Sequence, residues 1–168
     1  MKIAVIGAGP RATGICQLLT AGGYDVTRAD LEDGAAYDAS TGSEVVIFAG
    51  ARSEMDTTIA KVGRIMPETI VVDAMEGSSP DGPAESGAEL LAKQLNSPRV
   101  IRASIERPEP NANILLAGDD KDAMTIVEEI FRNSGCVTTD RGTLVHAGEI
   151  EAPARAQVVT PAQAGVST

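Results

Sequence analysis

The sequence has few aromatic residues, no tryptophan, one histidine and two cysteines. Phenylalanine and tyrosine together make up 2% of its 168 residues, so the chain lacks the stacking surfaces that bind single-stranded nucleic acid. One histidine and two cysteines are too few for a Cys/His metal cluster, and we expect no metal site. The net charge of -10, without a local basic patch, also excludes nucleic acid as an expected partner.

Long hydrophobic runs are missing as well. No stretch of about 18 consecutive apolar residues is present, so we expect no membrane partner. The apolar stretch 3–6 is too short for a signal peptide and runs into glycines, so we expect a cytoplasmic protein. Cys16 and Cys136 each lie in an apolar run, which is typical of small buried side chains.

Short apolar runs alternate with helical patterns along most of the chain. The predicted strands are residues 2–6, 24–29, 44–49, 69–74, 99–104, 113–118 and 135–139. The predicted helices are residues 11–21, 54–65, 85–95 and 121–133. This alternation predicts a Rossmann-like α/β fold, a doubly wound and mostly parallel sheet with helices on both faces. We expect one dinucleotide-binding domain over 1–151 and a flexible C-terminal tail over 152–168, where no periodicity is visible.

The segment Gly7-Ala8-Gly9-Pro10-Arg11-Ala12 follows the first predicted strand and begins the first predicted helix. In this context Gly7 permits a tight turn, Gly9 lets the backbone approach a pyrophosphate, and Ala12 replaces a third glycine. Arg11 either adds a cation there or is solvated. We predict that the segment binds the pyrophosphate of NAD or NADP at the positive end of the helix. The alternative is that the glycines serve only the strand-to-helix turn.

The end of the second predicted strand bears on the choice between NAD and NADP. Asp30 lies about 20 residues past the glycines, where an acidic side chain receives the adenosine ribose hydroxyls. A carboxylate there repels a 2′-phosphate and favours NAD. Arg28 lies two residues earlier on the same strand face and would pair with a 2′-phosphate, so NADP remains open.

The carboxyl ends of the third and fourth predicted strands point at the same crevice. The residues predicted to border the cofactor there are Ala49, Gly50, Ala51, Asp73, Ala74 and Met75. No Ser/His/Asp triad or Lys/Tyr pair is evident, and the catalytic residues stay unassigned. Hydride exchange between two bound molecules needs proximity and orientation more than acid–base help.

Several segments carry a resemblance to a known family. They are residues 2–9, 71–74, 85–91, 99–103, 118–123 and 140–144. In their order and spacing, over about 1–152, the sequence resembles the NADP-dependent deazaflavin oxidoreductases. That resemblance implies hydride transfer between a nicotinamide and the deazaflavin coenzyme F-420, a small-molecule second substrate and a homodimer.

The loops that face the reacting groups depart from that family. Residues 29–32 lack the usual pair that holds a 2′-phosphate, Met75-Glu76 replaces Asn-Pro, and 104–108 replaces Phe-Asn-Thr. No long helical extension follows Glu149, so we expect a divergent and C-terminally shortened relative. Three functions stay open: an NAD(P)-dependent oxidoreductase acting on a deazaflavin or another small acceptor, a dinucleotide-binding protein that is not an enzyme, and a repurposed scaffold for a non-redox cyclisation or isomerisation.

Overall fold

Seven strands form one sheet in the order β2-β1-β3-β4-β5-β6-β7 in the computed structural model, which describes residues 1–32, 34–77 and 85–151. The strands are β1 (Lys2–Ile6), β2 (Asp25–Ala29), β3 (Val45–Phe48), β4 (Ile70–Asp73), β5 (Val100–Ser104), β6 (Asn113–Gly118) and β7 (Val137–Asp140). Strands β1 to β5 are parallel to one another, β6 is antiparallel to β5, and β7 is parallel to β6. The predicted mostly parallel, doubly wound sheet is confirmed.

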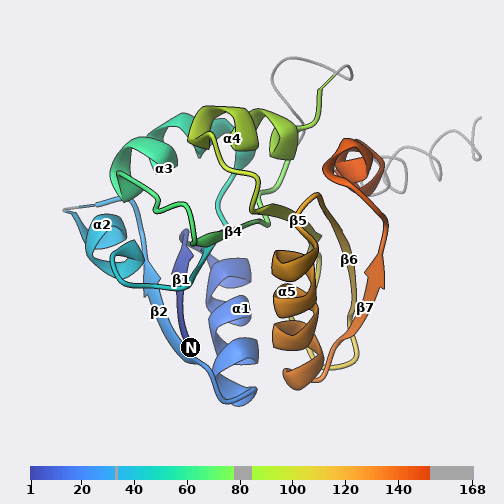
Figure 1. Cartoon of the computed structure of the whole chain (residues 1–168). Helices are drawn as coiled ribbons and strands as arrows, with labels where there is room; N and C mark the ends of the chain where they lie inside the picture. Colours follow the sequence, from blue (N-terminus) through green and yellow to red (C-terminus); the bar gives the residue numbers. More distant parts are fainter. Residues whose placement is uncertain (33, 78–84, 152–168) are drawn as a thin grey trace, which may run out of the picture.

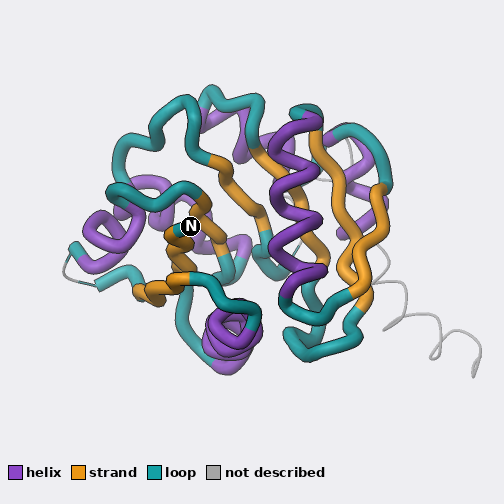
Figure 2. Tube along the Cα trace, turned by 60° about the horizontal axis from the view of Figure 1, so that its bottom comes forward, coloured by secondary structure: helices purple, strands orange, loops and turns teal. Residues whose placement is uncertain are grey.

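Helices cover both faces of this sheet (Figure 1). They are α1 (Pro10–Ala21), α2 (Ala35–Ser40), α3 (Met55–Val62), α4 (Gly87–Leu95) and α5 (Lys121–Asn133), with short 3-10 turns η1 (Arg52–Glu54) and η2 (Leu144–His146). Helices α1 and α5 pack on one face, and α2, α3 and α4 pack on the other. Figure 2 shows the sheet between these two helical layers. The result is a three-layer α/β/α arrangement.

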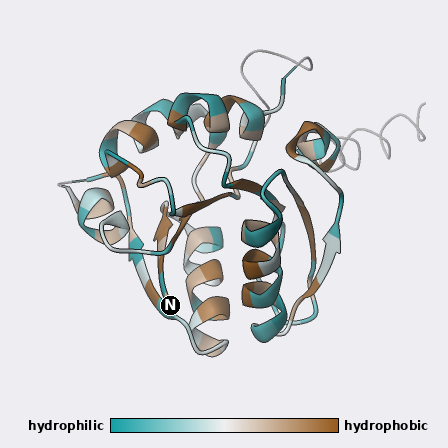
Figure 3. Ribbon diagram, viewed as in Figure 1, coloured by the Kyte–Doolittle hydropathy of each residue, from teal (hydrophilic) through white to brown (hydrophobic). Residues whose placement is uncertain are grey.

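The alternation of side chains along the central strands explains the two layers. Ile3 and Val5 of β1 belong to the core under α1 and α5, whereas Ala4 and Ile6 belong to the core under α2 to α4. Strands that are buried on both faces need apolar residues at nearly every position, as β3 shows throughout and β1 and β4 show except at the exposed Lys2 and the ion-paired Asp73. Figure 3 shows these central strands as the most hydrophobic part of the molecule, while the edge strand β7 is paler.

Two features differ from the sequence-based expectation. No helix was predicted between the second and third strands, but the structure contains α2 there, which buries only Ala36 and Ser40 and therefore leaves a weak hydrophobic signal. The direction of β6 was not predicted, because a buried strand has the same pattern in either direction, and β7 follows the direction of β6. The predicted tail 152–168 lies outside the described residues. None of the helices in the described ranges is long and apolar enough to cross a membrane.

Candidate functional site

A cleft of about 620 Å³ opens at the carboxyl ends of β1, β2 and β3. Its volume lies within the range typical of small-molecule and cofactor sites. Its lining residues come from the glycine turn, the end of β2 and the segments after β3 and β4: Gly7, Ala8, Pro10, Arg11, Asp30, Leu31, Glu32, Ala49, Gly50, Ala51, Glu54, Thr58 and Glu76. The structure therefore brings together the glycine turn, Asp30 and residues 49–51, as the strand-end argument predicts.

A hollow of similar volume, about 630 Å³, opens at the opposite edge of the sheet, at the amino ends of β3 and β4. Arg99 in its wall already pairs with Asp122 at 2.8 Å. Ligands of open α/β sheets bind at the carboxyl ends of the strands, where the order of connection reverses. We therefore take the cleft beside the glycine turn as the candidate site.

The glycine turn is shaped by two close approaches. A Cβ on Gly7 would lie 2.9 Å from both the carbonyl carbon of Ala49 and the nitrogen of Gly50, so only glycine lets β1 pass the end of β3. Gly9 has a φ of +94°, and a Cβ there would meet nothing within 4 Å. Gly9 is exposed between two residues that line the cleft, which leaves room for a ligand to approach its backbone.

Four backbone amides at this turn have no acceptor among the described residues: those of Ala8, Gly9, Arg11 and Ala12. The first hydrogen bond of α1 runs from the amide of Thr13 to the carbonyl of Gly9 at 3.1 Å. Free amides at the start of a helix, with the positive end of its dipole, are a favourable site for a pyrophosphate. Ala12 itself is fully buried against the sheet, as its predicted role requires.

Two carboxylates gather at the end of β2. Asp30 Oδ1 accepts a hydrogen bond of 3.1 Å from the amide of Glu32, and its other oxygen has no partner in the described part of the chain. Arg28, which was predicted to border the cofactor, is exposed and donates to the carbonyl of Gly7 at 3.2 Å. Asp30 and Glu32 thus line the cleft, while Arg28 lies outside its lining.

Arg11 is held against the inner end of the cleft rather than solvated. Its guanidinium donates to the carbonyls of Ala49 and Ile105, each at 3.1 Å, and also contacts the carbonyl of Ala74. Its Nε pairs with a carboxylate oxygen of Glu76 at 2.8 Å. Burial lowers the pKa of Arg11, and the neighbouring Glu76 opposes that shift. The side chain ties α1 to the segments after β3, β4 and β5.

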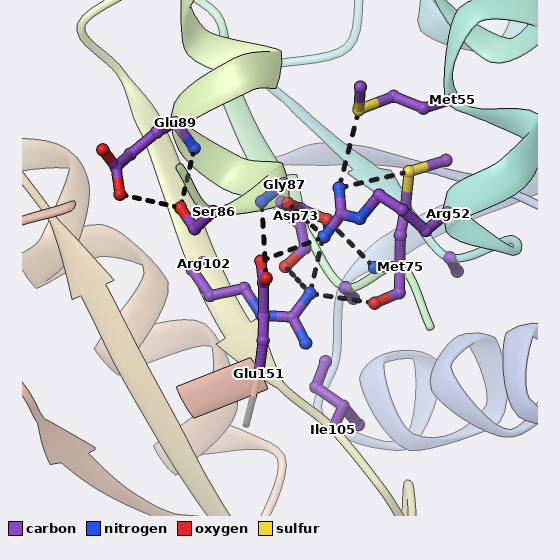
Figure 4. A network of polar contacts seen from close by, with 12 residues as sticks. Arg52, Met55, Asp73, Met75, Ser86, Gly87, Glu89, Arg102, Ile105 and Glu151 are labelled. Carbon is purple, nitrogen blue, oxygen red and sulfur yellow. Dashed lines mark hydrogen bonds and ion pairs between the residues drawn. The ribbon is translucent and has the colours of Figure 1, made fainter. Parts of the chain in front are cut away.

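Asp73, Ala74 and Met75, which were predicted to border the cofactor, are not among the residues that line the cleft. All three are buried, with at most 1% of their surface exposed. The segment after β4 turns inward because Asp73 accepts a hydrogen bond of 3.0 Å from the amide of Met75. Arg52 and Arg102 surround the Asp73 carboxylate, at 2.8 Å and 3.4 Å respectively (Figure 4). Asp73 therefore belongs to a buried ionic cluster next to the cleft.

Sequence reasoning did not assign Glu32, Glu54 and Thr58 to the cleft. Their positions in the sequence could have indicated this, because Glu32 follows β2, and Glu54 and Thr58 belong to the first turns after β3. Glu32 and Glu54, together with Asp30 and Glu76, make the lining acidic. These four carboxylates share the lining with one cation, Arg11. An acidic lining disfavours a ligand with an additional phosphate group.

The two thiols are separate from this site. Cys136 is buried and Cys16 is partly buried against the core that underlies α1 and α5. Burial raises the pKa of both thiols above its ordinary value. Both cysteines therefore have the properties of small core residues.

The comparisons with known proteins establish the fold. No protein-family model matches the sequence, and no curated protein matches it. A solved structure of a candidate F-420-dependent NADP reductase from Arthrobacter sp. FB24 superposes with a TM-score of 0.80 at 16% identity, over 98% of this chain and 95% of that one.

Two other structures are similar over part of their length. A variant imine reductase from Myxococcus stipitatus in complex with NAD+ superposes with a TM-score of 0.75 at 17% identity, over 99% of this chain and 63% of that one. Prephenate dehydrogenase from Aquifex aeolicus gives 0.65 at 13% identity, over 86% of this chain and 62% of that one. The chain thus spans under two thirds of the length of these two enzymes. The resemblance noted from the sequence holds at the level of the fold, and the chain has the Rossmann-like fold of these structures.

Proposed function

We propose that the protein binds NAD in the cleft and transfers hydride between its nicotinamide and a small acceptor, with a deazaflavin as the first acceptor to test. The observation that carries the proposal is the set of four free amides at the glycine turn, beside a cleft of about 620 Å³. These amides would bind the pyrophosphate, and the free oxygen of Asp30 would accept hydrogen bonds from the adenosine ribose. Candidate reductases of the same fold support the assignment.

The end of β2 supports NAD over NADP. Asp30 and Glu32 lie together where the adenosine ribose is expected, and two negative charges there repel a 2′-phosphate. Arg28 contacts the carbonyl of Gly7 instead of facing that position. Each unit charge pair at about 4 Å is worth roughly 1 to 4 kcal/mol between bulk water and a protein surface. We therefore expect NAD to bind at least about tenfold more tightly than NADP.

Bound NAD would supply the hydride acceptor or donor, and the chain would position it. The amides hold the pyrophosphate, and the segments after β3 and β4 form the far wall of the cleft. That wall is fixed by an isolated bridge between Ala51 and Glu76 and by the Arg11–Glu76 ion pair. Preorganised walls are what hydride transfer requires, because it depends on distance and orientation.

One observation favours a second candidate function. Arg11 crosses the inner end of the cleft and fills it with a guanidinium bonded to three carbonyls. A ligand that ends at this guanidinium would be a shorter nucleotide, and the chemistry would then be a non-redox reaction or none.

Titration calorimetry with NAD, NADP and ADP separates these functions. Tight binding of NAD with weaker NADP, followed by turnover with a deazaflavin or flavin acceptor, supports the oxidoreductase. Equal affinity for ADP and NAD, with no turnover on any acceptor, supports the second candidate.

A further inference from the structure

Four charged side chains are buried beside the wall of the cleft (Figure 4). Asp73 lies between Arg52 and Arg102, and Arg52 also pairs with Glu151 at 3.3 Å. Their side chains are exposed by 8% or less. Burying charges is costly even when they are paired, and apolar residues of the same volume often give more stability. Stability is therefore a poor explanation for this cluster.

The two guanidinium groups are incompletely bonded. The Nε atoms of Arg52 and Arg102 are buried without an acceptor among the described residues. Within the described ranges, Arg52 Nη1 meets only the thioether sulfurs of Met55 and Met75, at 3.6 and 3.8 Å, which are weak acceptors. Buried donors without partners are rare in proteins and call for a functional explanation.

Glu151 is held loosely in this cluster. One carboxylate oxygen is 3.3 Å from Arg52 Nη2, and the other is 3.3 Å from the amide nitrogen of Gly87. Charge-assisted hydrogen bonds are usually about 2.7 to 2.9 Å long. A carboxylate that fitted this site well would lie closer to both donors.

The surroundings of Glu151 suit a carboxylate. Gly87 is the first residue of α4, and its amide points at the carboxylate from the positive end of that helix. A Cβ on Gly87 would lie 2.3 Å from Arg52 Nε, so glycine lets the guanidinium pack against the same helix end. Without Glu151, two guanidinium groups would face only Asp73, leaving one positive charge uncompensated.

The cluster also adjoins the cleft. Arg52 directly follows Ala51 of the lining, and the amide of Arg52 donates to the carbonyl of Glu76 at 2.6 Å. Arg102 donates to the carbonyl of Met75 at 2.9 Å, one residue before Glu76. A group bound at the cluster would therefore lie next to residues that are adjacent in sequence to the wall of the cleft.

We propose that Arg52 and the amide of Gly87 form a carboxylate-binding subsite, which Glu151 fills in the free protein. A small carboxylic acid displaces Glu151 there, and its carboxylate anchors the second substrate of the reaction. The role in anchoring a second substrate rests on the proposed function, whereas the binding of a carboxylate does not require a bound nucleotide. The expected ligand is an organic acid that has a carboxylate taking no part in the reaction.

The test removes the internal carboxylate and restores it with a small molecule. Glu151→Ala deletes a CH2–COO⁻ fragment, which acetate replaces. We expect acetate to raise the Tm of Glu151→Ala by about 5 to 10 °C at roughly a hundred times its Kd, and to raise it further with the logarithm of its concentration. Acetamide, which has nearly the same shape without the charge, and chloride at equal ionic strength should give no such rise. Glu149→Ala, which removes an exposed carboxylate that pairs with His146, is the matched control and should respond to acetate only as the unaltered protein does.

The unaltered protein provides the second arm. Acetate, succinate and benzoate must displace Glu151 there, so at least one should raise the Tm above the chloride control, at about tenfold higher concentration than acetate needs in Glu151→Ala. Equal effects of acetate and acetamide in Glu151→Ala, or no rise in the Tm of the unaltered protein above the chloride control with any acid, would overturn the subsite. If the unaltered protein does not bind NAD, that result would refute the proposed function and leave the carboxylate result intact.

Discussion

Gly9 and Gly23 offer a matched pair of substitutions that separates ligand binding from backbone strain. Both have positive φ values, +94° and +92°, and a Cβ on either would meet nothing within 4 Å. They lie at opposite ends of α1, and only Gly9 adjoins the cleft. Alanine at such backbone conformations costs roughly 1 to 3 kcal/mol, and Gly9, with a ψ of 177°, lies in a region that is essentially confined to glycine. Each variant should therefore lose about 2 to 12 °C of Tm.

Only Gly9→Ala should lose affinity for NAD. Its methyl group would enter the space in which the pyrophosphate is expected to approach the backbone. We expect its Kd, measured by titration calorimetry, to rise at least about tenfold, which corresponds to roughly 1.4 kcal/mol. Gly23→Ala should bind NAD as the unaltered protein does. Equal Kd values for the two variants would refute the assignment of the glycine turn as the pyrophosphate site.

Three further perturbations test other parts of the account. Asp30→Ala should raise the affinity for NADP relative to NAD about tenfold, and an unchanged ratio in calorimetry would show that Asp30 does not face the ribose. Asp73→Asn leaves the buried guanidinium groups short of a negative charge and should cost about 3 to 5 kcal/mol in urea unfolding; a loss below about 1 kcal/mol would contradict the buried cluster. Burial raises the pKa of Cys16 and Cys136, so both should react with a disulfide reagent at pH 8 much more slowly than in the unfolded chain. Because the folded state holds these protons more tightly, stability should fall as the pH rises past the ordinary thiol pKa. Fast labelling of both thiols in the native protein would argue against that burial.

Much of the fold follows from local patterns. The predicted helix 121–133 has the bounds of α5, because Asp120 caps it by accepting a hydrogen bond of 2.8 Å from the amide of Ala123. The glycine turn was also predictable, since a strand, two glycines and a helix follow in a fixed order. Helix α2 was missed because it is only six residues long and buries only two of them.

The ionic cluster is the part of the site region that sequence alone could not reveal. Arg52, Arg102 and Glu151 have the same appearance in a sequence as the exposed charges around them. A partial signal was present in β5, where Arg102 lies between the apolar residues Ile101 and Ala103 and is buried like them. Which carboxylates approach it depends on tertiary packing, because Asp73 and Glu151 come from β4 and from the helical segment after η2.

The most direct test of the central claim is an NMR titration of the 15N-labelled protein with NAD. The claim is that the free amides at the start of α1 bind the pyrophosphate. It predicts the largest and saturable shifts for the amides of Ala8, Gly9, Arg11 and Ala12, with Asp30 following and Gly42 at the opposite edge of the sheet unchanged. Saturation with shifts confined to other regions, or no shifts at all, would contradict it.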